Sequence, residues 1–190
     1  MKVDWNAEVV DQMDSHWRHQ LRPRLDGLTD DEYFWEPVPG CWSLRRRGES
    51  SAPISLGIGE YTMDFAEGPH DRQPVTTIAW RLAHMIDNFG DPTVAHFQSK
   101  DPVSPTIAFA GSAEPALRQL DEGYAAWIAG VRSLGVEGLM RPQGALSPPQ
   151  FADAPISRLV MYSHVEVIHH GAEICLLRDL YAWIAGDTAI

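Results

Sequence analysis

Apolar residues recur at three- and four-residue steps in four stretches of the chain, with polar or charged residues between them. The stretches are residues 4–25, 76–89, 112–134 and 156–183. Such spacing puts the apolar side chains on one face of an α-helix. Pro23 and Gly27 mark the end of the first stretch, and Gly135 follows the third. The pattern therefore predicts four amphipathic helices around a shared core.

The second stretch carries a clear start signal and an irregular end. Thr76 or Thr77 can act as its N-cap, because a threonine hydroxyl accepts a hydrogen bond from a free amide of the first turn. The apolar pattern also allows this helix to continue past Gly90 and Pro92, with a kink, as far as Phe97.

Two connections without helical periodicity, residues 35–74 and 138–155, separate the predicted helices. Both are rich in proline and glycine. The first follows a capped single turn at residues 29–32 and contains four aromatic residues, which are too many for a disordered linker. Long connections in compact domains are usually functional. We expect an ordered, irregular crossover that folds over the end of the helices and covers a pocket.

Four helices joined by two substantial connections are typical of a four-helix bundle. The chain has 190 residues, of which 44% are hydrophobic, and this is enough for the core of one domain. We therefore predict an all-α fold, a single helical bundle domain over residues 1–190, with a long irregular crossover between the first and second helices.

Charge and composition narrow the functional classes. The net charge is -11, and Arg45–Arg47 is the only basic cluster, so we expect no nucleic-acid partner. No apolar run reaches the length of a membrane span, and the N-terminal residues lack a signal-peptide core. Two isolated cysteines, Cys41 and Cys175, do not form a disulfide framework. We expect a cytoplasmic protein without a membrane partner that acts on a small-molecule substrate.

The fourth predicted helix carries an ionisable pair on the face that should be apolar. Glu166 and His170 are four residues apart, so both side chains can reach one point. On a helical wheel His164 lies nearly opposite and His169 lies to one flank. The pair is consistent with two metal ligands or with a buried glutamate–histidine hydrogen bond, and spacing alone does not separate these interpretations.

His84, in the second predicted helix, provides a third candidate ligand. It shares a helix face with Trp80 and Asn88. A lone histidine on such a face is more often a satisfied core residue than a ligand. Together with Glu166 and His170, however, it would complete a His–Glu–His set with an open position, which is typical of a catalytic divalent site.

Four segments of the chain carry a family resemblance. They are LTDDEY (28–33), WEPVPGCWS (35–43), TIAWRLAH (77–84) and EVIHHGAEI (166–174). In these segments and in its helix order the chain resembles the DinB/YfiT-like superfamily of metal-binding four-helix bundles. Within that superfamily it is similar to the branch of mycothiol-dependent maleylpyruvate isomerase, which also has a glutamate at the first of the two fourth-helix positions.

The resemblance implies a metal site and a type of chemistry. It assigns His84, Glu166 and His170 as ligands of a divalent ion, most commonly zinc or nickel. It also implies a low-molecular-weight thiol such as mycothiol as cosubstrate, for S-transfer to a small electrophile or for isomerisation. Arg81, one turn before His84, is a weak candidate for a substrate anion contact, with a surface salt bridge as its alternative. The catalytic residues are unknown.

Two other functions remain open at this point. The chain could be a metal-assisted hydrolase with water in place of the thiol. It could also be a non-catalytic metal- or ligand-binding bundle, because a fold does not imply an activity. Exposed helix faces and the apolar segment Tyr181–Ile184 would also permit a homodimer.

Overall fold

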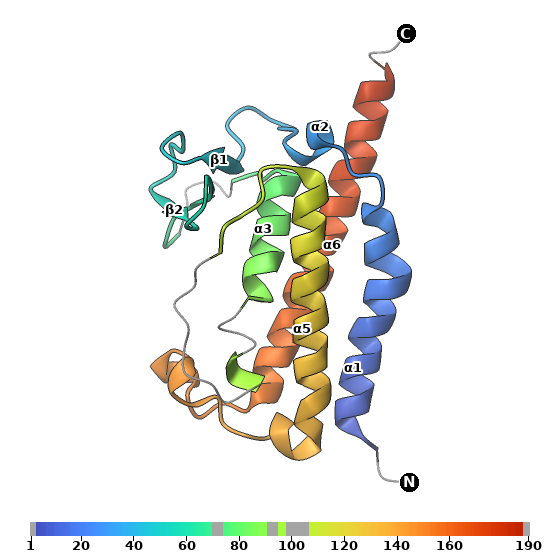
Figure 1. Cartoon of the computed structure of the whole chain (residues 1–190), viewed down its shortest axis with the longest axis vertical. Helices are drawn as coiled ribbons and strands as arrows, with labels where there is room; N and C mark the ends of the chain where they lie inside the picture. Colours follow the sequence, from blue (N-terminus) through green and yellow to red (C-terminus); the bar gives the residue numbers. More distant parts are fainter. Residues whose placement is uncertain (1–2, 70–73, 91–94, 98–106, 188–190) are drawn as a thin grey trace.

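Four long helices lie side by side in the computed structural model of the chain (Figure 1). They are α1 (Trp5–His16), α3 (Ile78–Asn88), α5 (Ala113–Leu139) and α6 (Ile156–Asp187). The structure describes residues 3–69, 74–90, 95–97 and 107–187. Within them α5 contacts α1, α3 and α6, and α6 also contacts α3. The prediction of a mostly helical chain is confirmed.

The helix ends follow local capping chemistry. The Asp4 carboxylate accepts hydrogen bonds from the first amides of α1, and the Thr77 hydroxyl accepts one from the amide of Trp80 in α3. α1 continues into a π-helical turn (Trp17–Leu21) and a 3-10 turn (Arg22–Leu25), so the first helical segment ends where the sequence predicts. α3 ends at Asn88, and residues 91–94 of its predicted continuation lie outside the described residues.

The third helix is longer than its pattern predicts. Gly135 has a φ of 60° inside α5, a backbone conformation that interrupts the regular helix, yet one more turn follows to Leu139. Glycine adopts a positive φ without the steric cost that a Cβ would add. The glycine therefore bends the helix rather than ending it.

The prediction of an irregular first crossover is wrong in one respect, because this segment contains a small sheet. Its antiparallel strands are β1 (Leu44–Arg46), β2 (Ile54–Leu56) and β3 (Tyr61–Phe65), in the order β1-β3-β2. Strands of three to five residues are too short to show a period of two. Their pairing depends on hydrogen bonds between separate segments, which no local pattern records.

The sheet is attached to the first turn of α3. The Trp80 indole N–H donates a 2.7 Å hydrogen bond to the Asp64 carbonyl of β3. The hydroxyls of Ser43 and Thr77, both buried, lie 2.8 Å apart. The crossover therefore fixes the start of the helix that carries His84.

Aromatic side chains form the centre of the core. Trp127 of α5 is fully buried and packs against Phe89, which follows α3, and against His164 of α6. Trp17 stacks on Tyr124 with ring centroids 3.9 Å apart, which joins α5 to the first helical segment. Such pairs add about 1 kcal/mol each beyond the burial of their surface. All four helices thus share one core.

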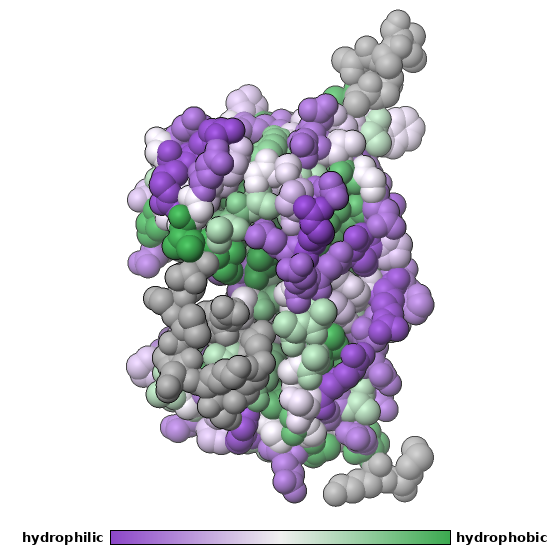
Figure 2. Space-filling view, in the orientation of Figure 1, coloured by the Kyte–Doolittle hydropathy of each residue, from purple (hydrophilic) through white to green (hydrophobic). Residues whose placement is uncertain are grey.

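The outer surface differs between helices. Hydrophilic side chains dominate the surface over α1 (Figure 2). Among the described residues no helix combines the length and the apolar content that crossing a bilayer requires.

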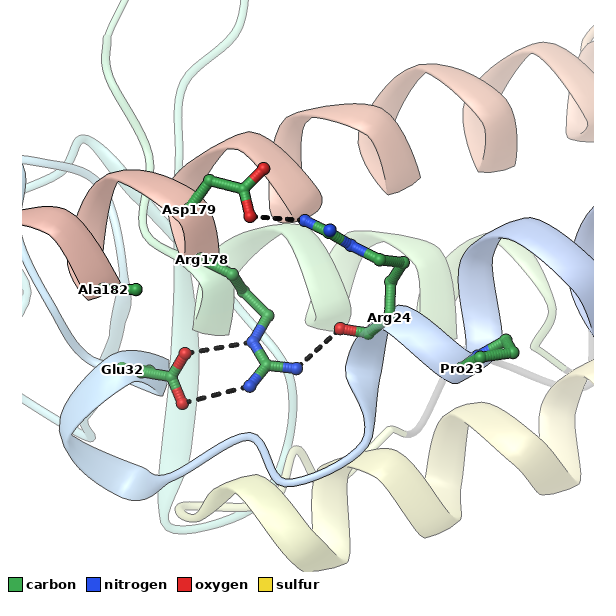
Figure 3. A pocket seen from close by; sticks show the side chains of 6 residues that line it. All are labelled: Pro23, Arg24, Glu32, Arg178, Asp179 and Ala182. Carbon is green, nitrogen blue, oxygen red and sulfur yellow. Dashed lines mark hydrogen bonds and ion pairs between the residues drawn. The ribbon is translucent and has the colours of Figure 1, made fainter.

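An arginine of α6 holds the short helix α2 (Asp30–Tyr33) in place (Figure 3). Arg178 Nε and Nη2 donate to the two carboxylate oxygens of Glu32 at 3.0 and 3.3 Å, and Nη1 donates to the Arg24 carbonyl at 2.6 Å. Glu32 also completes the predicted capping box with Thr29. Burial would raise the pKa of the Glu32 carboxyl, but its bonds with Arg178 and Thr29 lower it.

Replacing Arg178 should destabilise the fold. Arg178→Ala leaves the buried Glu32 carboxylate without its cation, and we expect a loss of about 3 kcal/mol in the free energy of unfolding. For a chain of this size the loss corresponds to a melting temperature lower by about 10 °C, measured by circular dichroism. The exposed pair Arg118–Glu114 is the control, and Arg118→Ala should change stability by less than about 1 kcal/mol.

The pH dependence checks the cause of this loss. A lowered folded-state pKa means that the stabilisation is present above the unfolded carboxyl pKa, about 4.3, and is lost as the pH falls below it. The difference between the wild type and Arg178→Ala should therefore shrink in acid. An equal difference at pH 3 and pH 7 would contradict the ionic explanation.

Candidate metal centre

Three candidate ligands meet between α3 and α6. His84 Nε2 lies 3.1 Å from Glu166 Oε2, and His170 Nε2 lies 3.2 Å from the same oxygen. One donor atom from each of the three residues lies within 4.8 Å of the others. The four-residue spacing on α6 and the packing of α6 on α3 bring the set together. The donor set of two imidazoles and one carboxylate fits a divalent ion such as zinc.

Ring packing fixes the orientation of the two histidines. The indole of Trp80 stacks on the His84 ring at 5.2 Å with an interplanar angle of 17°. The His84 and His170 rings are perpendicular, with centroids 4.8 Å apart. Trp80 also meets the His170 ring edge-on. The hydrogen bond from Trp80 to β3 thus positions the whole group.

A second glutamate orients His170 from behind. Glu173 Oε2 lies 2.7 Å from His170 Nδ1 and also pairs with the Arg81 guanidinium. When Nδ1 carries the proton and donates it to Glu173, the lone pair of Nε2 faces Glu166 and His84. Carboxylates commonly orient metal-binding histidines in this way. The i to i+3 spacing from His170 to Glu173 is the signal in the sequence that could have identified this role.

The protonation states of His170 and Glu166 at pH 7 are those that bind a metal cation. Burial, the nearby His84 and Arg81 lower the pKa of His170 to about 4, so its imidazole is neutral at pH 7. Burial would raise the pKa of Glu166, but interactions with Tyr162 and His84 hold it below the ordinary value. Neutral imidazole and ionised carboxylate are the forms that bind metals.

Arg81 lies inside this site rather than on the surface. Its side chain is 13% exposed and pairs with Glu173, and burial lowers its pKa to about 10, so it remains a cation. The carboxylate of Glu173 is the kind of partner that a salt bridge of Arg81 requires. The pair is largely buried, however, and does not lie on the surface. A second group of candidate ligands consists of His169, His170 and Glu173, and His169 Nε2 lies 3.3 Å from Glu173 Oε1. The Arg81 charge on Glu173 opposes a cation there.

The remaining histidines differ from one another. His164 is buried against Trp127 instead of facing solvent, and burial lowers its pKa to about 4. His96 is buried in a short helical segment, with Nε2 3.0 Å from Ser147 Oγ. His70 lies outside the described residues.

Neither cysteine supplies a nucleophile to this site. Cys41 is buried, and its thiol donates to the Val38 carbonyl. Burial raises its pKa, which disfavours the thiolate. Cys175 lies on α6 beyond the ligand turn and is not among the candidate ligands.

His170 should titrate far below an ordinary histidine in the metal-free protein. The folded-state pKa of His170, about 4, lies below the unfolded value of about 6.5. The contribution of His170 to the free energy of unfolding is therefore fully present above pH 6.5 and is lost as the pH falls toward 4. Long-range ¹H–¹⁵N NMR spectra, assigned with a His170→Gln variant, measure this midpoint. A midpoint near 6.5 would contradict burial as the controlling influence.

Comparison with known proteins identifies a family for this chain. Searches of curated protein sequences and of solved structures give no match. A family model described as DinB superfamily matches residues 12–174, which include α3 and the ligand turn of α6. This match covers most of the chain, and the chain therefore belongs to the DinB superfamily.

Proposed function

We propose that the chain is a divalent-metal-dependent enzyme that transfers a low-molecular-weight thiol such as mycothiol to a small electrophile, or isomerises the electrophile through thiol addition. In this proposal His84, Glu166 and His170 hold zinc or nickel. The observation that carries it is the convergence of these donors within 4.8 Å. Proteins of the DinB superfamily generally bind metals, which supports the same assignment.

The ion would supply a Lewis acid that keeps a bound thiol or water deprotonated near neutral pH. Two imidazoles and one carboxylate leave a coordination position for an outside ligand. The protein's own cysteines do not reach this position, so a thiol nucleophile has to come from a cosubstrate. This requirement favours thiol transfer from a small molecule over a protein-bound thiol intermediate.

The surrounding residues have separate tasks in this proposal. Burial and the neighbouring Glu166 raise the pKa of Tyr162 to about 12, so its hydroxyl remains a donor toward the Glu166 carboxylate. Glu173 keeps the Nδ1 proton of His170, and the Trp80 ring shields His84 from water on one side. Arg81 balances the charge of Glu173. A contact between Arg81 and a substrate anion stays a prediction. The cytoplasmic location of the protein also stays a prediction.

An electrophile panel tests the function. Zinc-loaded wild-type protein should consume at least one electrophile in the presence of mycothiol or bacillithiol, and His84→Ala should reduce that rate at least about 100-fold because the open three-ligand site is lost. Metal analysis of the purified variants reports ion content in parallel. His19→Ala, an exposed histidine of the π-helical turn, is the matched control and should retain metal and rate.

Other results point to other functions. Turnover that does not need a thiol would favour the metal-assisted hydrolase. Stoichiometric metal without turnover, with His84→Ala lowering only the melting temperature, would favour a non-catalytic metal-binding protein. Wild-type protein that takes up no divalent ion would reject the proposal.

A further inference from the structure

A cavity of about 360 Å³ lies beside the start of α6. Its wall includes Ser147, Pro148, Phe151, Arg158, Leu159 and Tyr162. The 3-10 turns Gly144–Leu146 and Pro149–Phe151 form one side, and the first two turns of α6 form the other. Pockets for small organic ligands begin at about 300 Å³ and are mostly apolar, as this one is.

One cation stands out in this apolar wall. The Arg158 guanidinium lies 4.9 Å from the centroid of the Phe151 ring, a cation–π contact. No carboxylate of the described residues pairs with it. In a chain with a net charge of -11, an arginine that lines a cavity and has no acidic partner in the described part of the chain is available to an anionic group of a ligand.

The polar part of the wall is neutral and fixed. Gln143 Nε2 donates to the Pro155 carbonyl at 3.1 Å, which sets the amide so that Oε1 accepts the Ser147 hydroxyl proton at 2.6 Å. His96 Nε2 must then donate to Ser147 Oγ. Ser147 therefore keeps its proton and is no activated nucleophile. Arg158 is the charged residue among the described residues that line the cavity, and it gives the cavity a preference for anions.

Tyr162 joins the cavity to the metal centre. Its side chain lines the cavity, and Glu166 follows it one turn further along α6, so the two residues are neighbours on one side of the helix. A molecule in the cavity would consequently have one end near Arg158 and could extend along Tyr162 toward His84, Glu166 and His170.

We propose that this cavity is the substrate pocket of the metal centre and takes a small molecule with an apolar or aromatic body and a carboxylate or similar anionic group, which Arg158 binds. The assignment of the cavity to the metal centre rests on the proposed metal-dependent function. The binding of an anion by Arg158 is independent of that function.

Matched ligands test the pocket. We expect 3-phenylpropanoate to bind at least about 10-fold more tightly than its neutral amide, because only the carboxylate pairs with Arg158. Arg158→Gln should remove this preference, measured by ligand-detected NMR and thermal shift. Arg118→Gln removes the same charge from an exposed site on α5 and should keep the preference. Equal binding of the two probes, or equal behaviour of the two variants, would overturn the proposal.

Paramagnetic cobalt(II), in place of zinc, tests the link to the metal centre. Relaxation of the bound probe's proton signals should increase in cobalt-loaded wild type, and His84→Ala should abolish this increase while the probe still binds. Unchanged relaxation in cobalt-loaded protein would show that the cavity is not the substrate pocket. If the wild type takes up no metal, the proposed function fails, and the Arg158 comparison still decides the anion site.

A second inference concerns the outward face of α6, which is apolar like its inward face. The exposed residues at helical spacing are Met161, Val165, Ile168, Ala172, Leu176 and Trp183. Their exposed fractions include 54% at Met161 and 75% at Trp183. A helix that is apolar on opposite faces is normally buried on both. The stripe is about 33 Å long at 1.5 Å per residue.

The order of residues in this stripe is symmetric about Ala172 at two pairs of positions, whereas the counterpart of Val165 is Asp179, an exposed carboxylate on the same helix face that pairs with Arg24. Ile168 and Leu176 lie four residues to either side of Ala172, and Met161 and Trp183 lie eleven residues to either side. A twofold axis at Ala172 would place Ile168 opposite Leu176 and Met161 opposite Trp183 in two antiparallel α6 helices, with the small side chain at the crossing. The Arg24–Asp179 pair would then lie opposite Val165.

We infer that α6 forms a homodimer through this face, with the two helices antiparallel. The two symmetric pairs favour a second copy of the chain as the partner, because a different partner would not require this symmetry. Dimerisation would also cover the edge of the metal centre at Tyr162, which is 54% exposed in the single chain.

Light scattering coupled to size exclusion tests this interface. The wild type should have twice the chain mass of 21.2 kDa, and Leu176→Glu should have the single-chain mass. Ile58→Glu changes an equally exposed isoleucine that precedes β3 and should stay dimeric. A single-chain mass for the wild type, or a dimeric Leu176→Glu, would refute the inference.

Disulfide formation tests the direction of the helices. In a Cys175→Ser background, Met161→Cys chains mixed with Trp183→Cys chains should form cross-linked dimers on mild oxidation. Met161→Cys chains alone should not. Cross-linking of Met161→Cys alone would indicate parallel helices and contradict the twofold axis at Ala172.

Discussion

The contact between α3 and α6 buries several ionisable groups, and the organisation of the site depends on how they are paired. Arg81 and His84 come from α3, and Glu166, His170 and Glu173 come from α6. Each group would be costly to bury alone. Arg81 neutralises Glu173, Glu173 holds the Nδ1 side of His170, and Glu166 lies between the two imidazoles. The charges thus fix the register of the two helices.

Three different faces of α6 explain why one helix contributes so much of the chemistry. One face, with Val160, Val167 and Ile174, is fully buried in the core. A second carries Glu166 and His170, and a third carries the exposed apolar stripe. Because a helix turns about 100° per residue, side chains a few residues apart point in unrelated directions. A single continuous helix can therefore stabilise the fold, hold ligands and offer a contact surface.

The crossover between α1 and α3 supports the site from outside the helices. Its sheet accepts the Trp80 hydrogen bond, and the Trp80 ring packs on both histidines. The second connection, between α5 and α6, forms the wall of the Arg158 cavity. The first irregular segment therefore supports the candidate ligands, which the helices carry, and the second forms the wall of the cavity beside α6.

The helices and the two candidate ligands on α6 were predictable from the sequence. Apolar spacing located the helical stretches, and the four-residue step from Glu166 to His170 selected this pair over His164 and His169, because helix geometry is local and periodic. Other features became visible only in the structure: the short sheet, the burial of His96, the contacts of Glu173 and Arg81 with His170, and the approach of His84 to α6. These features depend on contacts between segments far apart in the chain, whose burial and charge pairing no local pattern encodes.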